Sequence, residues 1–123
     1  MASLIEREVP DSDERRIVAG ILWKRIENGI PLQVDATICY IKSGPCLPIT
    51  EEDKDRDSLY NTYRYLGLPP APISNPGADA IEASKNPEDS PYWYYISDPE
   101  TNQTIFAQTL DEHNRNVVKY LGD

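Results

Sequence analysis

The chain has 123 residues, and its 12 Lys and Arg stand against 21 Asp and Glu, which gives a formal net charge of −9. This length fits one domain with a buried core, and the acidic balance excludes nucleic acid and anionic membrane surfaces as ligands, because clustered Lys and Arg bind both. Hydrophobic residues make up 39% of the sequence, with eight Tyr and two Trp, so we expect a folded domain and not a disordered acidic tail.

The N-terminal part of the chain predicts two helices. Residues 2–9 are expected to form the end of a short helix, which Pro10 cannot continue. Asp11 followed by Glu14 resembles a capping box, and apolar residues at helical spacing then run to a stop at Asn28-Gly29. The chain begins almost inside its first helix, which suggests a domain excised from a longer protein.

The middle of the chain predicts one short helix between long loops. Asp35 is placed to cap a helix that ends before Gly44-Pro45. Residues 42–58 are expected to be exposed and loop-rich, with a solvated acidic run at their end. Residues 60–77 are too rich in proline for regular structure, and they are well suited to a fixed loop that lines a groove.

The C-terminal part predicts a helix, a hairpin and a second helix. Asn75-Pro76 is expected to open a helix that stops before Pro87. Residues 92–96 and 104–107 are β-prone runs joined by a turn, as in an antiparallel hairpin. Thr109 is expected to cap the last helix. The predicted fold class is α+β, a mostly helical domain with one small antiparallel β-hairpin or sheet.

The cysteines and the histidine offer little for catalysis. Cys39 and Cys46 lack the spacing and the neighbouring histidine of a zinc site. A disulfide between them is feasible in an oxidising compartment, but two ordinary thiols are the favoured interpretation. His113, the only histidine, lies in a helix that packing and capping explain. We therefore predict no metal and no cofactor, and chemistry must rest on carboxylates and aromatic residues.

One carboxylate, Glu6, stands apart from the others. On a helical wheel it borders the apolar stripe of Ala2, Ile5 and Val9, whereas Glu8 projects to nearly the opposite side. A carboxyl group beside apolar surface can keep its proton near neutral pH, as a general acid must. Residue types alone still favour an exposed, salt-bridged Glu6.

A second group of residues suggests a ligand class. It comprises Gln33, Tyr60, Asn61 and Tyr63, the last three at the start of the proline-rich loop. Tyrosine faces and side-chain amides suit a neutral polymer rich in hydroxyl and acetamido groups, such as a glycan. The alternative is that these tyrosines belong to the core, and for residues 92–95 we prefer that alternative.

Short motifs recur in order across almost the whole chain. They are ASLIERE at 2–8, RIVAG at 16–20, PLQVDAT at 31–37, YNTY at 60–63, GLPPAPI at 67–73, NPG at 75–77 and EHN at 112–114. With these motifs the sequence resembles the YceG-like endolytic murein transglycosylases, the MltG family. Several motifs in order are far more specific than one.

The resemblance implies a fold and a reaction. It implies a lysozyme-like transglycosylase site that cleaves the β-1,4 bond between N-acetylmuramic acid and N-acetylglucosamine and leaves a 1,6-anhydro end. Glu6 would be the catalytic acid and then the base, and Gln33, Tyr60, Asn61 and Tyr63 would line the sugar groove. Two alternatives are a hydrolytic muramidase and a non-catalytic module that binds peptidoglycan or docks a partner.

The resemblance also implies a setting. Residues 1–123 would be the catalytic domain of a longer protein with an N-terminal membrane anchor, acting on peptidoglycan strands at the extracytoplasmic face of the bacterial membrane. Peptidoglycan synthases, the penicillin-binding proteins, would be its partners. The chain departs from the family pattern at Ala36, where proline is common, at Ala71, where glycine is common, and at Thr104, beside which a histidine is often found.

Overall fold

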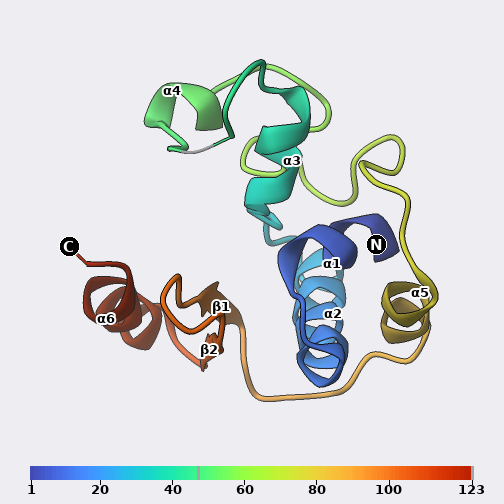
Figure 1. Cartoon of the computed structure of the whole chain (residues 1–123), viewed down its shortest axis with the longest axis vertical. Coiled ribbons are helices and arrows are strands. Elements are labelled where there is room, and N and C mark those ends of the chain that lie inside the picture. Colours follow the sequence, from blue (N-terminus) through green and yellow to red (C-terminus); the bar gives the residue numbers. More distant parts are fainter. Residues whose placement is uncertain (47, 123) are drawn as a thin grey trace.

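The computed structural model describes residues 1–46 and 48–122. Within these ranges the elements are α1 (Ala2–Glu8), α2 (Ser12–Glu27), α3 (Asp35–Ile41), α4 (Glu51–Lys54), α5 (Ala78–Lys85), β1 (Tyr94–Ser97), β2 (Thr104–Ala107) and α6 (Leu110–Leu121). Figure 1 shows α1 and α2 at the centre, α5 on one side, and the hairpin with α6 on the other. The predicted α+β class is confirmed. None of the helices in the described ranges has the length and apolar character needed to cross a bilayer.

The core lies where α1, α2 and α5 meet. Apolar residues at helical spacing on α1 and α2 turn toward each other, and two alanines of α5 let that helix approach closely. The buried cluster comprises Leu4, Ile5, Val9, Val18, Ala19, Leu22, Leu32, Val34, Ala80 and Ala83. Because Leu32 and Val34 belong to it, the segment that leads into α3 is anchored in the same core.

Helix α2 begins as expected from the sequence. Asp11 Oδ1 accepts hydrogen bonds from the backbone N–H groups of Asp13 and Glu14, at 2.9 and 3.1 Å. The reciprocal half of a capping box does not form, because the Glu14 carboxylate accepts the Thr104 hydroxyl of β2 instead. The hairpin is thereby tied to the start of α2.

Two predicted helix caps are wrong. The N-cap of α3 is Val34, and Asp35 lies in the first turn, where its carboxylate accepts the Tyr63 hydroxyl. The N-cap of α5 is Gly77 and not Asn75, so that helix begins two residues later than expected. Both helix starts are in contact with distant parts of the chain: Asp35 accepts the Tyr63 hydroxyl, and Gly77 donates its N–H to Glu6.

The hairpin is antiparallel, as predicted, with Tyr95 opposite Phe106. Buried Arg25 at the end of α2 holds its first strand in place. The Arg25 guanidinium donates to the carbonyl of Trp93 at 2.7 and 3.0 Å, and to the carbonyl of Leu32 at 2.8 Å. One cation therefore fixes both the strand that carries Tyr95 and the segment that precedes α3.

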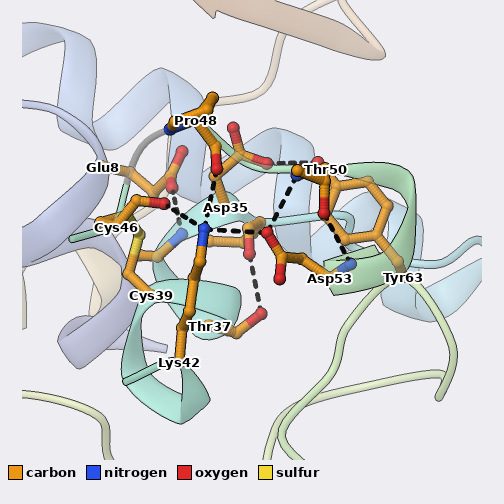
Figure 2. The surroundings of a disulfide bond; sticks show 12 residues. Glu8, Asp35, Thr37, Cys39, Lys42, Cys46, Pro48, Thr50, Asp53 and Tyr63 are labelled. Carbon is orange, nitrogen blue, oxygen red and sulfur yellow. Dashed lines mark hydrogen bonds and ion pairs between the residues drawn. A yellow bond between two sulfur atoms is a disulfide. The ribbon is translucent and has the colours of Figure 1, made fainter. Parts of the chain in front are cut away.

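The disulfide prediction needs correction. Cys39 and Cys46 are paired in the structure, with Cα atoms 4.9 Å apart, whereas two thiols were favoured from sequence. Figure 2 shows Lys42 beside this disulfide. Its ammonium group donates to the carbonyls of Cys46 and Pro48, at 3.1 and 2.8 Å, and pairs with Asp53 at 2.9 Å.

The acidic run is exposed as predicted at Glu51, Glu52, Asp55 and Asp57, and Asp53 is the exception. The Asp53 side chain is 15% exposed, and its pKa is lowered to about 2, first by the Lys42 hydrogen bond and then by the backbone N–H of Thr50. Asp53 and Thr50 form a complete capping box that opens α4. Residues 42–58 therefore contain a short helix, α4, which the Lys42–Asp53 ion pair holds against the end of α3.

Candidate active site

The carboxyl group of Glu8 is the centre of the candidate site. Glu8 is the last residue of α1, and its Oε2 accepts a hydrogen bond from the Tyr95 hydroxyl of β1 at 2.9 Å. Its Oε1 faces the backbone N–H of Ala36, in the first turn of α3, at a longer 3.4 Å. Three elements that are far apart in sequence meet at this group.

Burial raises the pKa of Glu8 to about 7. Loss of solvent is the largest cause, and the neighbouring Asp35 carboxylate adds to it, because both disfavour the charged form. The hydrogen bonds from Tyr95 and Ala36 act in the opposite direction, since they stabilise that form. A carboxyl group with a pKa near 7 can donate a proton at neutral pH and afterwards accept one.

Asp35 and Tyr63 form a second polar pair beside Glu8. The Tyr63 hydroxyl donates to Asp35 Oδ1, and the Lys54 ammonium lies over the Tyr63 ring, 5.1 Å from its centroid. Burial, followed by the Asp35 carboxylate, raises the pKa of Tyr63 well above its ordinary value. The Tyr63 hydroxyl therefore stays protonated and remains a hydrogen-bond donor.

Buried threonines hold the segment that leads to Asp35. Thr62 Oγ1 accepts the Val34 N–H at 2.9 Å and lies 2.9 Å from Thr37 Oγ1, which donates to the Val34 carbonyl at 2.7 Å. Within this segment Gln33 is exposed and has a φ of 53°, in the left-handed region that is uncommon for residues other than glycine. Such backbone positions cluster at functional sites.

Glu6 occupies a different environment from Glu8. Its Oε2 pairs with Arg15 at 3.1 Å, and its Oε1 accepts the N–H of Gly77 at 2.8 Å. Arg15 also pairs with Asp79 of α5 at 2.9 Å. The Gly77 hydrogen bond first, and then the Arg15 charge, lower the pKa of Glu6. This is the salt-bridged arrangement, and it joins α1, α2 and α5.

The four predicted sugar-binding residues do not share one location. Tyr63 lies beside Glu8, and Gln33 lies exposed two residues before Asp35. Tyr60 packs against the Tyr40 ring, with centroids 5.0 Å apart. The structure therefore brings Tyr63 to the carboxyl group and places Tyr60 against α3.

Asn61 has a structural role in this arrangement. It is fully buried, and its Nδ2 donates to the carbonyls of Lys54 and Arg56, at 2.9 and 2.8 Å. Its Oδ1 accepts the Tyr63 N–H at 2.9 Å. With its amide bonded to the backbone in this way, Asn61 shapes the turn that presents Tyr63 and does not reach a groove.

Sequence reasoning missed Glu8 and Tyr95. The helical wheel placed Glu8 opposite Glu6, but α1 packs against α2, α3 and α5, so more than one of its faces is covered. The spacing held a usable signal, because Glu8 follows Leu4 by four residues and Ile5 by three, and both are buried. For Tyr95 the sequence held no such signal, since residues 92–95 were expected to belong to the core.

His113 lies apart from the hydrogen bonds around Glu8. Its ring stacks on Tyr94, with centroids 5.0 Å apart, and burial followed by the Arg25 charge lowers its pKa. Its Nδ1 is buried and has no hydrogen-bond partner among residues 1–46 and 48–122. A ring stacked on Tyr94 agrees with the packing role expected from the sequence.

The comparisons with known proteins all point to one family. The YceG-like family model matches residues 1–119. The chain is similar to the endolytic murein transglycosylase of Bacillus subtilis (strain 168), with 36% identity over 121 residues, which are 98% of this chain and 33% of that protein. It is also similar to the endolytic murein transglycosylase of Streptococcus pneumoniae (strain D39), with 33% identity over 98% of this chain and 23% of that protein.

A solved structure supports the same relationship. A crystal structure of a yceG-like protein from Listeria monocytogenes superimposes with a TM-score of 0.83 and 39% identity, covering 94% of this chain and 38% of that one. The chain thus spans a third or less of the length of the two curated relatives compared here. On the match of residues 1–119, this chain belongs to the YceG-like family.

Proposed function

We propose that this chain acts as an endolytic murein transglycosylase with Glu8 as its catalytic acid. The observation that carries the proposal is the half-buried Glu8 carboxyl group, which lies between three elements and has a pKa raised to about 7. The names of the relatives supply the substrate class, the peptidoglycan glycan strand. Its sugars carry the hydroxyl and acetamido groups that tyrosines and amides bind well.

The proposed reaction uses one carboxyl group twice. Protonated Glu8 donates its proton to the glycosidic oxygen, and the bond from that oxygen to the anomeric carbon of N-acetylmuramic acid breaks. The Glu8 carboxylate then takes the proton of the muramoyl C6 hydroxyl, and O6 bonds to the anomeric carbon. The products are a 1,6-anhydro end and a free N-acetylglucosamine end, so no water is consumed and Glu8 is again protonated.

Glu6 remains the prediction that the family resemblance implies, and we prefer Glu8 on physical grounds. Gly77 and then Arg15 lower the pKa of Glu6, which disfavours the protonated form that a general acid needs. In our proposal Glu6 holds α1 against α2 and α5 through Arg15. The two assignments make opposite predictions for single substitutions.

A hydrolytic muramidase is the second candidate, and one contact favours it. Asp35 is close enough to raise the pKa of Glu8, so the site holds the pair of carboxyl groups that a glycosidase uses. Tyr63 already donates to Asp35, which makes that carboxylate a weaker nucleophile or base. For this reason we place the transglycosylase first.

We further propose that the chain works outside the cytoplasmic membrane, as part of a longer anchored protein and near peptidoglycan synthases. Its proposed polymer substrate lies there. The Cys39–Cys46 pair supports this location, because disulfides persist in oxidising compartments. Copurification of the full-length protein with penicillin-binding proteins from crosslinked membranes would test the partner.

Product analysis tests the proposed reaction. Wild type is incubated with purified sacculi, the soluble fragments are separated, and their masses are measured, with Glu8→Gln as the inactive reference. We expect anhydro ends, lighter by one water than the reducing ends that a muramidase leaves. Reducing ends would establish the muramidase instead. Binding of glycan strands without any released product would establish the non-catalytic module.

A further inference from the structure

We propose that the Cys39–Cys46 disulfide is a redox-sensitive device, whose reduction by a dithiol opens the following segment and loosens the turn that presents Tyr63. We call residues 42–46 and 48–58 the α4 segment. The proposal goes beyond the proposed function, because it concerns how this part of the fold is held, and it is independent of which glutamate of α1 donates the proton. It starts from the way in which the α4 segment is attached to the domain.

The α4 segment has no apolar anchor of its own. None of its described residues is buried, and none belongs to the apolar cluster between α1, α2 and α5. In Figure 1 helix α4 lies at the upper edge of the molecule, farther from the centre than α3. Segments with few buried apolar contacts open at a low free-energy cost, so polar and covalent contacts must hold this one.

The contacts that hold the α4 segment converge on the end of α3. The disulfide joins Cys39 of α3 to Cys46, with Cα atoms 4.9 Å apart. Figure 2 shows Lys42 between them, and its ammonium group donates to the Cys46 carbonyl at 3.1 Å and pairs with Asp53 at 2.9 Å. Arg56 donates to the carbonyl of the last residue of α3 at 2.9 Å. Because the disulfide fixes Cys46 beside α3, it also fixes a carbonyl to which Lys42 is bonded.

The other end of the α4 segment is bonded to the turn that presents Tyr63. Buried Asn61 donates its amide to two carbonyls of the segment, those of Lys54 and Arg56. The Asn61 Oδ1 accepts the Tyr63 N–H at 2.9 Å, and the Lys54 ammonium lies 5.1 Å from the Tyr63 ring centroid. If the segment opens, the buried amide loses both acceptors, which is costly, so the turn rearranges as well.

Reduction by a dithiol removes the covalent contact in two steps. One thiolate of the dithiol attacks a sulfur of the disulfide, which forms a mixed disulfide and frees one cysteine. The second thiol of the dithiol then displaces the other cysteine. Two electrons and two protons pass to the protein, which gains two thiols, while the dithiol becomes a disulfide. Both Cys39 and Cys46 are partly exposed, so a small dithiol can approach them.

Proteolysis under native conditions measures whether the α4 segment opens. Wild type is compared with Cys39→Ser/Cys46→Ser, and with wild type that has been reduced by dithiothreitol and capped with iodoacetamide. Each is digested with a glutamate-specific protease, and the cut sites are identified by mass. We expect cleavage after Glu51 and Glu52 to be about 10- to 100-fold faster in both disulfide-free forms, the effect of opening a loop of this length.

Tryptophan fluorescence and NMR show how far the opening spreads. Trp23 and Trp93 lie outside the α4 segment, and their emission should stay native in the disulfide-free forms, because α2 and the hairpin remain folded. The backbone amide signal of Tyr63 should shift or broaden, since its acceptor is Asn61. The amide signal of Tyr94 on the hairpin should not move.

Lys42→Met tests the polar contacts while the disulfide stays intact. This variant removes the ammonium group that bonds the end of α3 to α4, so cleavage after Glu52 should rise by about tenfold. Lys85→Met, at the end of α5, is the matched control and should be digested at the wild-type rate. A Lys42→Met variant that resists the protease as wild type does would contradict the proposed attachment.

Three further outcomes would overturn the proposal. Equal cleavage rates with and without the disulfide would show that it does not hold the α4 segment. Faster cleavage with an unchanged Tyr63 signal would show that the segment and the turn are independent. Loss of native tryptophan emission in the disulfide-free forms would show that the disulfide supports the whole domain and not one segment. None of these readouts involves glycan cleavage, so a failure of the proposed function would be seen separately, as wild type that releases no product.

Discussion

Replacing Glu8 by glutamine should change how the free energy of unfolding depends on pH. Burial raises the Glu8 pKa from 4.5 to about 7 in the folded chain, so the folded state binds this proton more tightly than the unfolded state does. The contribution is fully present below pH 4.5 and is lost as the pH rises through 7. A pKa change of this size corresponds to about 3 kcal/mol.

Urea denaturation of wild type and Glu8→Gln, repeated at pH values from about 4 to about 8, measures this difference. Relative to the variant, wild type should lose up to about 3 kcal/mol of stability across the range. Glu6→Gln is the matched control with the opposite sign. Because the Glu6 pKa is lowered in the fold, its contribution is fully present above pH 4.5 and is lost as the pH falls below 4.5, so the difference between wild type and this variant should stay nearly constant above pH 4.5. If the free energy of unfolding changed with pH in the same way for wild type and Glu8→Gln, the raised pKa of the Glu8 carboxyl group in the folded chain would be refuted.

Three further substitutions test how the fold supports the site. Thr62→Val should cost about 1–3 kcal/mol in urea denaturation, because the buried N–H of Val34 loses its acceptor, and an unchanged midpoint would contradict this. Gly20→Ala should lower the melting temperature, since the added Cβ would lie 2.2 Å from the carbonyl oxygen of Glu88, and a stabilised variant would show that residue 88 moves freely. Cys39→Ser should cost about 2–3 kcal/mol by opening an eight-residue loop, reduced wild type should match it, and a thiol-insensitive wild type would contradict the pairing.

Local signals in the sequence predicted most of the elements. The proline at position 10, the Asp11 cap and the apolar spacing after it predict α1 and α2 within one residue of their observed bounds. The two β-prone runs predict the hairpin, and Thr109 predicts the start of α6. These features depend on neighbours in the chain, so one sequence contains enough to find them.

The helix starts that failed depend on distant residues. Asp35 has the right type for an N-cap, but the hydroxyl of Tyr63 competes for its carboxylate. Asn75 also has the right type, yet the N-cap of α5 is Gly77, whose N–H donates to Glu6. A capping preference of about 1 kcal/mol is small enough for one tertiary hydrogen bond to override.

The candidate site could be predicted only in part for the same reason. The motif at residues 2–8 directed attention to α1, and Tyr63, which was predicted to line the sugar groove, lies close enough to Glu8 for that carboxylate to raise its pKa. Which glutamate of α1 becomes buried depends on how α3 and the hairpin pack, and a helical wheel of seven residues does not contain that information. The contact between Glu8 and Tyr95 joins positions 87 residues apart.

The most direct test of the account is the rate of anhydro-end formation by Glu8→Gln compared with Glu6→Gln. Both variants are assayed on purified sacculi after circular dichroism has shown that each is folded. Loss of a general acid should slow Glu8→Gln by about 10²- to 10⁴-fold, while Glu6→Gln should stay within about tenfold of wild type. An active Glu8→Gln together with an inactive, folded Glu6→Gln would contradict the assignment and return the catalytic role to Glu6.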